Sequence, residues 1–300
     1  MATLSKKIDF IGFISVNRAN PNGDPLNGNQ PRTDYDGYGE ITDVCLKRKI
    51  RNRWQDMGEH ILVQSNDRSD DDYTSIRERL EAEPTLAELL KQKKDRGAKW
   101  ERQLVEAACK AWIDVRSFGQ LIALKKGAGV DAVSIGIRGP VSIHFATSLD
   151  PVTVTSTQIT KSVNGEPGEK RSSDTMGMKH RVDFGVYKLI GSVNVQLAER
   201  TGFSDEDAEK LKQALITLFE NDASSARPEG SMVVERLYWI EHEHKTSFVP
   251  TAKVHRAVEA RKREGIEMPK SFADYVVDDS ALDKIPEACV EKYIDGELVK

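Results

Sequence analysis

The sequence contains few cysteines and no long apolar run. Cys45, Cys109 and Cys289 are widely separated and form neither a C-x-x-C pair nor an even set, so we expect reduced thiols in a cytoplasmic protein. Residues 1–7 lack the charged-then-apolar layout of a secretory signal, and no apolar stretch approaches the ~20 residues of a membrane helix. These absences predict a soluble intracellular protein with no membrane partner.

Recognisable catalytic patterns are also scarce. There is no Walker A motif, and six scattered histidines do not indicate a nucleophilic triad. His242 and His244 form a possible metal pair without a nearby third ligand, and residues 70–72 are more typical of a solvated acidic loop than of a cation site. Asp34 and Asp36 could activate water on a bound phosphodiester, although turn-forming aspartates are favoured. We therefore predict no catalytic residue, no metal and no cofactor.

The excess of acidic over basic residues belongs to the end of the chain. A formal net charge of −4 alone argues against a simple cationic nucleic-acid binder. However, residues 274–300 contain eight acids and three lysines, and the remaining chain has 41 bases against 40 acids. Locally basic segments elsewhere could therefore still bind an anion.

Apolar periodicity and turn signals predict an α+β chain. In chain order we expect a central strand at 8–16, a long loop at 17–39, a helix from Thr42 or Asp43 to about Met57, a polar loop at 66–83, two helical pieces within 86–112, strands near 133–137 and 141–145, a polar hairpin or arm at 157–181, a strand at 182–197, a helix beginning at Ser204, a strand at 231–241 and a basic helix at 252–264. This order is the βαββαβ ferredoxin-like plan, with large inserts, and it also underlies RNA-recognition domains.

The long loop and the helix after it form a basic constellation. The helix carries Lys47, Arg48, Lys49, Arg51 and Arg53 within seven residues, with no acid among them. Such cations suit phosphates, which need charge and forked donors, and loop amides could add neutral contacts. The alternative is a solvated helix face beside a turn-rich loop, and the two interpretations are about equally supported.

Two further segments carry weaker signals. In the polar arm, Met176 and Met178 beside Lys179 and His180 could wedge against bases while cations hold phosphates, although a loop without function is the commoner case. The segment 114–119 (DVRSFG) could present Arg116 and Phe118 to a ligand or could simply end a helix.

The first loop and helix contain a long and specific block that continues in two later segments. Its parts are 20–25 (NPNGDP), 31–34 (PRTD), 37–39 (GYG), 41–52 (ITDVCLKRKIRN), 114–119 (DVRSFG) and 139–141 (GPV). In these parts the chain closely resembles the backbone subunit of type I-C CRISPR effector complexes, a member of the repeat-associated mysterious protein (RAMP) superfamily.

The resemblance implies a modified RNA-recognition fold shaped like a hand, with a β-hairpin thumb. Several copies are expected to polymerise head to tail along one CRISPR RNA as the spine of a Cascade surveillance complex, together with other Cascade subunits. Each copy grips guide phosphates, the thumb displaces a guide base at intervals, and the open bases pair with target DNA. The subunit is expected to be a scaffold and not an enzyme.

The resemblance also implies a division of the chain and a set of contact residues. A single RAMP/RRM-like domain over 1–300 would have a palm core near 8–57, 113–150 and 181–245, a finger or palm insert at 58–112, a thumb hairpin at 151–180 and a C-terminal helical and acidic segment at 246–300. The expected RNA-binding residues are Arg18, Asn20, Asn22, Arg32, Lys47, Arg48, Arg51, Arg116 and Phe118. The expected thumb residues are Arg171, Met176, Met178, Lys179 and His180.

Two rival functions stay open at this point. Type III relatives cleave target RNA with an aspartate in the first loop, for which Asp34 and Asp36 are the candidates here. The chain could also be a free-standing RNA-binding module, which would bind RNA as discrete monomers.

Overall fold

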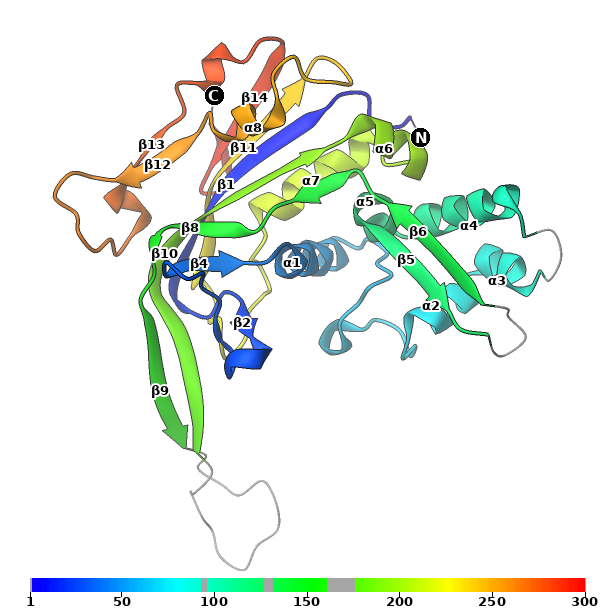
Figure 1. Cartoon of the computed structure of the whole chain (residues 1–300), viewed down its shortest axis with the longest axis horizontal. Coiled ribbons are helices and arrows are strands. Elements are labelled where there is room, and N and C mark those ends of the chain that lie inside the picture. Colours follow the sequence, from blue (N-terminus) through cyan, green and yellow to red (C-terminus); the bar gives the residue numbers. More distant parts are fainter. Residues whose placement is uncertain (1, 93–95, 127–131, 161–175, 300) are drawn as a thin grey trace, which may run out of the picture.

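The computed structural model describes residues 2–92, 96–126, 132–160 and 176–299 (Figure 1). Within those ranges, each helix is too short or too polar to cross a membrane. The three cysteines are free thiols.

One antiparallel sheet forms the centre of the structure (Figure 1). Its strands in spatial order are β15 (Glu297–Val299), β14 (Ala288–Ile294), β11 (Met232–His242), β1 (Ile8–Ala19), β10 (Met176–Val193), β8 (Ala146–Pro151) and β4 (Tyr38–Ile41), with β7 (Val141–Ile143) and β9 (Val154–Thr160) also paired to β10. Residues 8–16 of β1 are all buried. The prediction of a central first strand with nearly continuous apolar character is therefore confirmed.

Three helices cover one face of this sheet: α1 (Asp43–Asp56), α6 (Val195–Thr201) and α7 (Asp205–Ile216). The predicted apolar stripe of α1 is confirmed, because Leu46, Ile50 and Trp54 are fully buried in the core. Burying one such side chain contributes roughly 1.5–3 kcal/mol. The predicted starts are also confirmed: Thr42 accepts a hydrogen bond from the Cys45 amide, and α7 begins with a Ser204 capping box.

The C-terminal segment covers the opposite face of the sheet. It contains α8 (Thr251–His255), β12 (Glu259–Lys262), η3 (Phe272–Asp274), β13 (Tyr275–Asp278) and η4 (Leu282–Lys284). Val254 and Val258 are buried there against Ile11 and Phe13 of β1. The predicted helix at 252–264 is therefore wrong after residue 255, because burial of this segment and the β12–β13 pairing override local helix propensity.

The acidic end of the chain, residues 274–299 in the structure, also forms no α-helix, and it packs on the rest of the protein. Strands β14 and β15 extend the main sheet from β11, and Glu291 of β14 forms an ion pair at 2.7 Å with Lys212 of α7. The expectation of a helical segment over 246–300 is corrected to a mainly strand-forming one.

The insert builds a second hydrophobic core. Its elements are η2 (Asn66–Arg68), α2 (Ile76–Ala82), α3 (Pro84–Lys91), α4 (Ala98–Ala111), α5 (Ile113–Phe118), β5 (Gly119–Leu124) and β6 (Val133–Arg138). Trp100 and Leu104 of α4 pack in one cluster with Ile122 of β5 and Ile137 of β6. The β5–β6 hairpin thus belongs with the insert and not with the palm core, and the predicted loop at 66–83 contains a helix.

Two glycines fix the junction between the insert and the sheet. Gly119 has φ +80°, and a Cβ placed on it would lie 2.2 Å from the carbonyl oxygen of Ile137. A Cβ on Gly139 would lie 2.3 Å from the carbonyl oxygen of Ser117. The segments 114–119 and 139–141 therefore meet backbone to backbone, which only glycine permits.

A long hairpin, formed by β9 and the first part of β10, projects from the sheet (Figure 1). Strand β9 pairs antiparallel with the first seven residues of β10, from Val154 opposite Val182 to Thr160 opposite Met176. The expected extended hairpin is therefore present in the described residues. Arg171 lies outside them.

A buried charged cluster joins the start of β1 to the C-terminal segment. The Asp9 carboxylate is fully buried and lies 2.7 Å from Lys7 Nζ and 2.8 Å from His242 Nε2. Burial raises the pKa of Asp9, but the hydrogen bonds from His242 and Lys7 outweigh it and hold that pKa below its usual value. His255 donates from Nε2 to the Gly191 carbonyl at 2.9 Å, and burial is the main cause of its lowered pKa.

His255 makes the fold sensitive to mild acid. Below its ordinary pKa of about 6.5, the unfolded chain binds a proton that the buried ring resists, so the free energy of unfolding is expected to fall between pH 7 and pH 5. Urea unfolding at both pH values measures this loss. In His255→Gln, which can still donate to Gly191 but does not titrate, the loss should be smaller. An equal loss in both proteins would contradict the assignment to His255.

Candidate nucleic-acid interface

The first loop is held in a defined shape by its asparagines. Within it lie β2 (Gly23–Asp24), η1 (Pro25–Asn27) and β3 (Gln30–Pro31). The Asn20 side chain is buried and donates to the Asn29 carbonyl at 2.8 Å. Asn22 Oδ1 accepts from the amide and the hydroxyl of Thr42, at 3.0 and 2.9 Å. These two predicted contact residues thus order the loop against the start of α1.

Each cation of α1 has an acidic partner. The pairs are Lys47–Asp43 (2.9 Å), Arg48–Asp67 (2.9 Å), Lys49–Asp222, Arg51–Asp114 (2.8 Å) and Arg53–Asp56 (3.5 Å). The expectation of a patch with no neutralising acid is therefore wrong. Asp67, Asp114 and Asp222 fold against this helix from distant parts of the chain, and Asp43 and Asp56 at its two ends neutralise Lys47 and Arg53.

These pairs differ in how accessible the cation is. The Arg48 side chain is 53% exposed and its Asp67 partner 71%, so a phosphate can replace that partner at little cost. The Arg51 side chain is only 14% exposed, and its Asp114 partner is completely buried. Arg48 is thus accessible to a ligand, whereas Arg51 is largely buried and paired with a buried carboxylate.

Arg116 and Phe118 also face the interior. Arg116 forms a forked pair with Asp207, at 2.9 and 2.8 Å, and thereby ties α5 to the capping box of α7. The Phe118 ring stacks on Trp54 at 5.3 Å between centroids. Lys47 Nζ and Arg51 Cζ lie over the Phe118 ring, at 5.9 and 5.0 Å from its centroid.

A first groove, which we call the loop–helix groove, brings three predicted residues together. Its volume is about 640 Å³, and its lining includes Asn22, Arg32 and Arg48. Arg32 lies 3.2 Å from Asp24 with its side chain one-third exposed. The groove therefore presents two arginines whose present partners are surface carboxylates.

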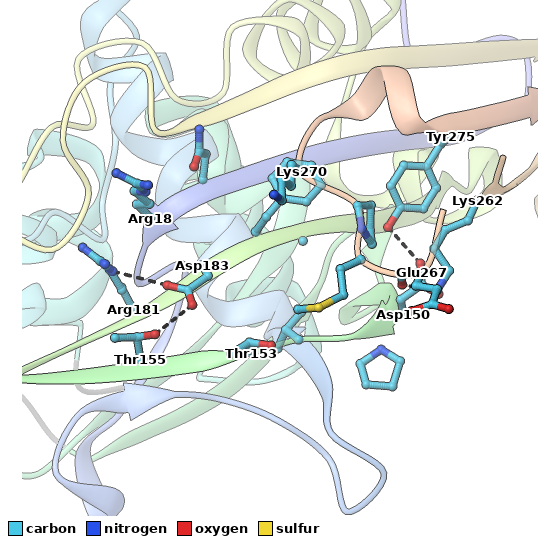
Figure 2. Close-up of a pocket in the computed structure, with 17 residues that line it drawn as sticks. Arg18, Asp150, Thr153, Thr155, Arg181, Asp183, Lys262, Glu267, Lys270 and Tyr275 are labelled. Atoms are coloured by element: carbon cyan, nitrogen blue, oxygen red, sulfur yellow. Dashed lines mark hydrogen bonds and ion pairs between the residues drawn. The ribbon is translucent and has the colours of Figure 1, made fainter. Parts of the chain in front are cut away.

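A second groove, the hairpin-base cleft, lies where the hairpin leaves the sheet (Figure 2). Its volume is about 790 Å³. Arg18 and Arg181 come from β1 and β10, whereas Lys262, Lys270 and Tyr275 come from the C-terminal segment (Figure 2). Of the predicted RNA-binding set, Arg18 alone lines this cleft.

One acidic side chain, that of Asp150, joins the two walls of the hairpin-base cleft. Asp150 of β8 accepts a hydrogen bond from the Tyr275 hydroxyl at 2.8 Å and pairs with Lys262 at 3.0 Å. Burial is the main reason that the pKa of Tyr275 is strongly raised, with the Asp150 carboxylate adding to it, so the phenol stays a hydrogen-bond donor. On the strand wall, Asp183 lies 3.4 Å from Arg181.

The described part of the hairpin has two different faces. Met176, Met178 and His180 alternate along β10 and so share one face, on which both methionines are exposed. His180 Nδ1 lies 2.7 Å from Ser156 Oγ. Lys179 is exposed on the other face, opposite Thr157.

Asp34, one of the two aspartates considered for catalysis, shapes a turn. Asp34 Oδ1 accepts from the amides of Asp36 and Tyr38, at 3.0 and 2.8 Å, which is a turn-forming arrangement. His242 is buried against Asp9 and cannot share a metal with His244. Among the described residues, one cluster has metal-ligand spacing, the exposed group of Glu243, His244 and Glu287.

Lys262, Lys270 and Tyr275 were not predicted as site residues. The basic run at 261–263 is the available signal, but the sequence pattern predicts a helix there. Neither their position on a β12–β13 flap nor their proximity to Arg18 could be read from local sequence.

Known proteins support a family assignment. The family model described as CRISPR-associated protein Cas7 matches residues 6–280. A CRISPR-associated protein Cas7 of Haloferax volcanii is 28% identical over 239 residues, covering 75% of this chain and 67% of that protein.

Two solved structures are more distant. A chain of a "CRISPR RNA-guided surveillance complex, pre-nicking" has a TM-score of 0.44 and 15% identity, with 78% of each chain covered. A chain of a "CRISPR RNA-guided surveillance complex" has the same score and identity over 96% of this chain and 88% of that one. Because the family model spans all but the first five and last 20 residues, the chain belongs to the Cas7 family of CRISPR-associated proteins.

Proposed function

We propose that this Cas7 protein is the CRISPR RNA-binding backbone subunit of a type I-C Cascade complex in the cytoplasm. Several copies bind head to tail along one guide RNA, alongside other Cascade subunits, and leave guide bases free to pair with target DNA. The observation that carries this proposal is the family match over residues 6–280, joined to the specific block around the first loop and α1.

The strand order supports a ferredoxin-like core. Strands β1, β7–β8, β10 and β11 take the four strand positions of a βαββαβ unit, with α1 and α7 as its helices. Their spatial order β11-β1-β10-β8 is antiparallel throughout, as that plan requires. In RNA-recognition domains the sheet stacks bases on exposed aromatics, but here the C-terminal segment covers that face. A protein with this covered sheet is suited to holding the RNA backbone.

The residues divide into two groups under this proposal. Arg18, Arg32 and Arg48 contact guide phosphates, and the exposed methionine face of the hairpin displaces a base. A second group, Lys47, Arg51, Arg116 and Phe118, keeps the loop, α1 and the insert in place through ion pairs and stacking.

Co-purification with guide RNA tests the function. The full chain, expressed with its CRISPR RNA, is expected to give particles whose mass by native mass spectrometry increases by whole protein copies as the guide is lengthened. Discrete single-copy complexes, independent of guide length, would favour a free-standing RNA-binding module. Failure to retain any RNA would overturn the proposal.

The enzymatic alternative is tested in the same particles. We propose a non-enzymatic role, which fits the turn-forming hydrogen bonds of Asp34. Complementary RNA with magnesium should therefore stay intact. Cleavage that Asp34→Ala or Asp36→Ala abolishes would establish a type III-like ribonuclease instead.

A further inference from the structure

The hairpin-base cleft has features of a ligand site that the proposed phosphate contact of Arg18 does not by itself explain. One wall is formed by the strands at the base of the hairpin and the other by the C-terminal flap at 259–278 (Figure 2). The inference drawn from it rests on the proposed function, because it names what part of the RNA this cleft receives.

Arg18 is held in this cleft by an unusual backbone conformation. Its φ is +52°, in the left-handed region that few residues other than glycine adopt. Its neighbours Asn17 and Ala19 pair with Phe184 and Val182, but Arg18 itself is skipped in the ladder. The exposed Arg18 side chain lines the cleft. Such conformations cost free energy and cluster at functional sites.

The charges of the cleft are not balanced. Asp150 is paired with Lys262, and Asp183 with Arg181. Within the described residues, Arg18 and Lys270 have no carboxylate at ion-pair distance. Together with the exposed Glu267, the lining carries four cations against three acids. Two cations from opposite walls are therefore available to a phosphate group.

The remaining lining is apolar and suits a base. Met268 is 72% exposed, and it lines the cleft together with Pro269 and the half-buried Phe184. A volume of about 790 Å³ falls within the range of about 300–1,000 Å³ found for small-molecule sites. The two cations that lack a carboxylate partner within the described residues suit the phosphate of a nucleotide, and the Met268 thioether and the Phe184 ring suit its base.

We infer that the hairpin-base cleft holds one nucleotide of the guide RNA between the hairpin and the C-terminal flap. Arg18 and Lys270 bind its phosphate from opposite walls, and Met268 and Phe184 contact its base. The C-terminal segment is thus part of the RNA-binding surface and not only a cover for the sheet.

The test uses the full chain with fluorescently labelled guide RNA. Lys270→Glu and Arg18→Gly are each expected to raise the Kd about tenfold; glycine keeps the left-handed backbone while removing the side chain. The matched control is Lys253→Glu, an exposed lysine of α8 in the same segment that does not line the cleft. This control should change the Kd less than twofold.

A photo-crosslinking residue in place of Met268 identifies the occupant. It is expected to form an adduct with guide RNA. An adduct with the hairpin of a second copy, or binding by both cleft variants equal to that of the Lys253→Glu control, would overturn the inference while leaving the proposed function standing. If the unmodified chain bound no guide RNA at all, both would fall.

Discussion

Replacing Arg51 with alanine is expected to lower the free energy of unfolding by about 3 kcal/mol, because it leaves a buried carboxylate without its counter-ion. Asp114 is completely buried and accepts hydrogen bonds from Arg51 Nε at 2.8 Å and from the amides of Leu62 and Val63 at 2.9 and 3.2 Å. The amides remain in the variant, but the positive charge does not. The same change also removes the guanidinium that lies 5.0 Å from the Phe118 ring centroid.

Urea unfolding of the RNA-free protein measures this loss. Arg48→Ala is the matched control on the same helix, since its ion pair is exposed and should contribute less than about 0.5 kcal/mol. The sequence pattern predicts Arg51 as a phosphate ligand, whereas the structure places it in an architectural pair. If Arg51→Ala unfolded like the unmodified protein but lost guide binding, the sequence-based role would be correct.

Local pattern was sufficient for the elements whose apolar residues repeat regularly. The buried stripe of Leu46, Ile50 and Trp54 has helical spacing, and the capping box at Ser204 marks the start of α7. Strand β1 is apolar almost throughout because both faces of the sheet are covered. These features depend on neighbours within one or two helical turns or on a continuous apolar run.

The same sequence patterns could not predict ion pairs and strand pairs between residues that are distant in the sequence. A helical wheel places Lys49 and Arg51 on the flanks of α1, but their partners Asp222 and Asp114 are 173 and 63 positions further along the chain. Residues 256–264 contain helix-forming side chains, yet β12 is a strand because β13 pairs with it. The cations of α1 can thus be read from the sequence, but which of them remain accessible to a ligand depends on these long-range pairs.

The segments 114–119 and 139–141, which contain Gly119 and Gly139, illustrate why a specific sequence block need not be a binding site. Segment 114–119 contains Asp114, Arg116 and Phe118, which pair or stack in the interior, and it ends at Gly119. Gly119 and Gly139 allow the backbone of this segment to approach that of residues 137–139 closely. Much of the block that indicates the family is therefore explained by the architecture that holds the first loop and α1 together.

Arg32 and Arg48 of the loop–helix groove should carry the largest binding effect. In the double variant Arg32→Ala with Arg48→Ala, the affinity for guide RNA is expected to fall roughly thirtyfold, since two phosphate contacts of about 1 kcal/mol each are lost. Their present partners, Asp24 and Asp67, are at the surface, so an incoming phosphate displaces weak ion pairs. When several copies share one RNA, the losses multiply along the strand.

Salt dependence distinguishes phosphate contacts from base contacts in this variant. For single-stranded nucleic acid each neutralised phosphate contributes a slope of about 0.7 in a plot of log affinity against log salt, so the double variant should flatten that slope by about 1.4. The loss should be equal for guides of different sequence, because the phosphate backbone carries no sequence information. Lys253→Ala, which lies outside both grooves, serves as the control. A loss that varied with guide sequence, at an unchanged slope, would instead assign Arg32 and Arg48 to the recognition of bases.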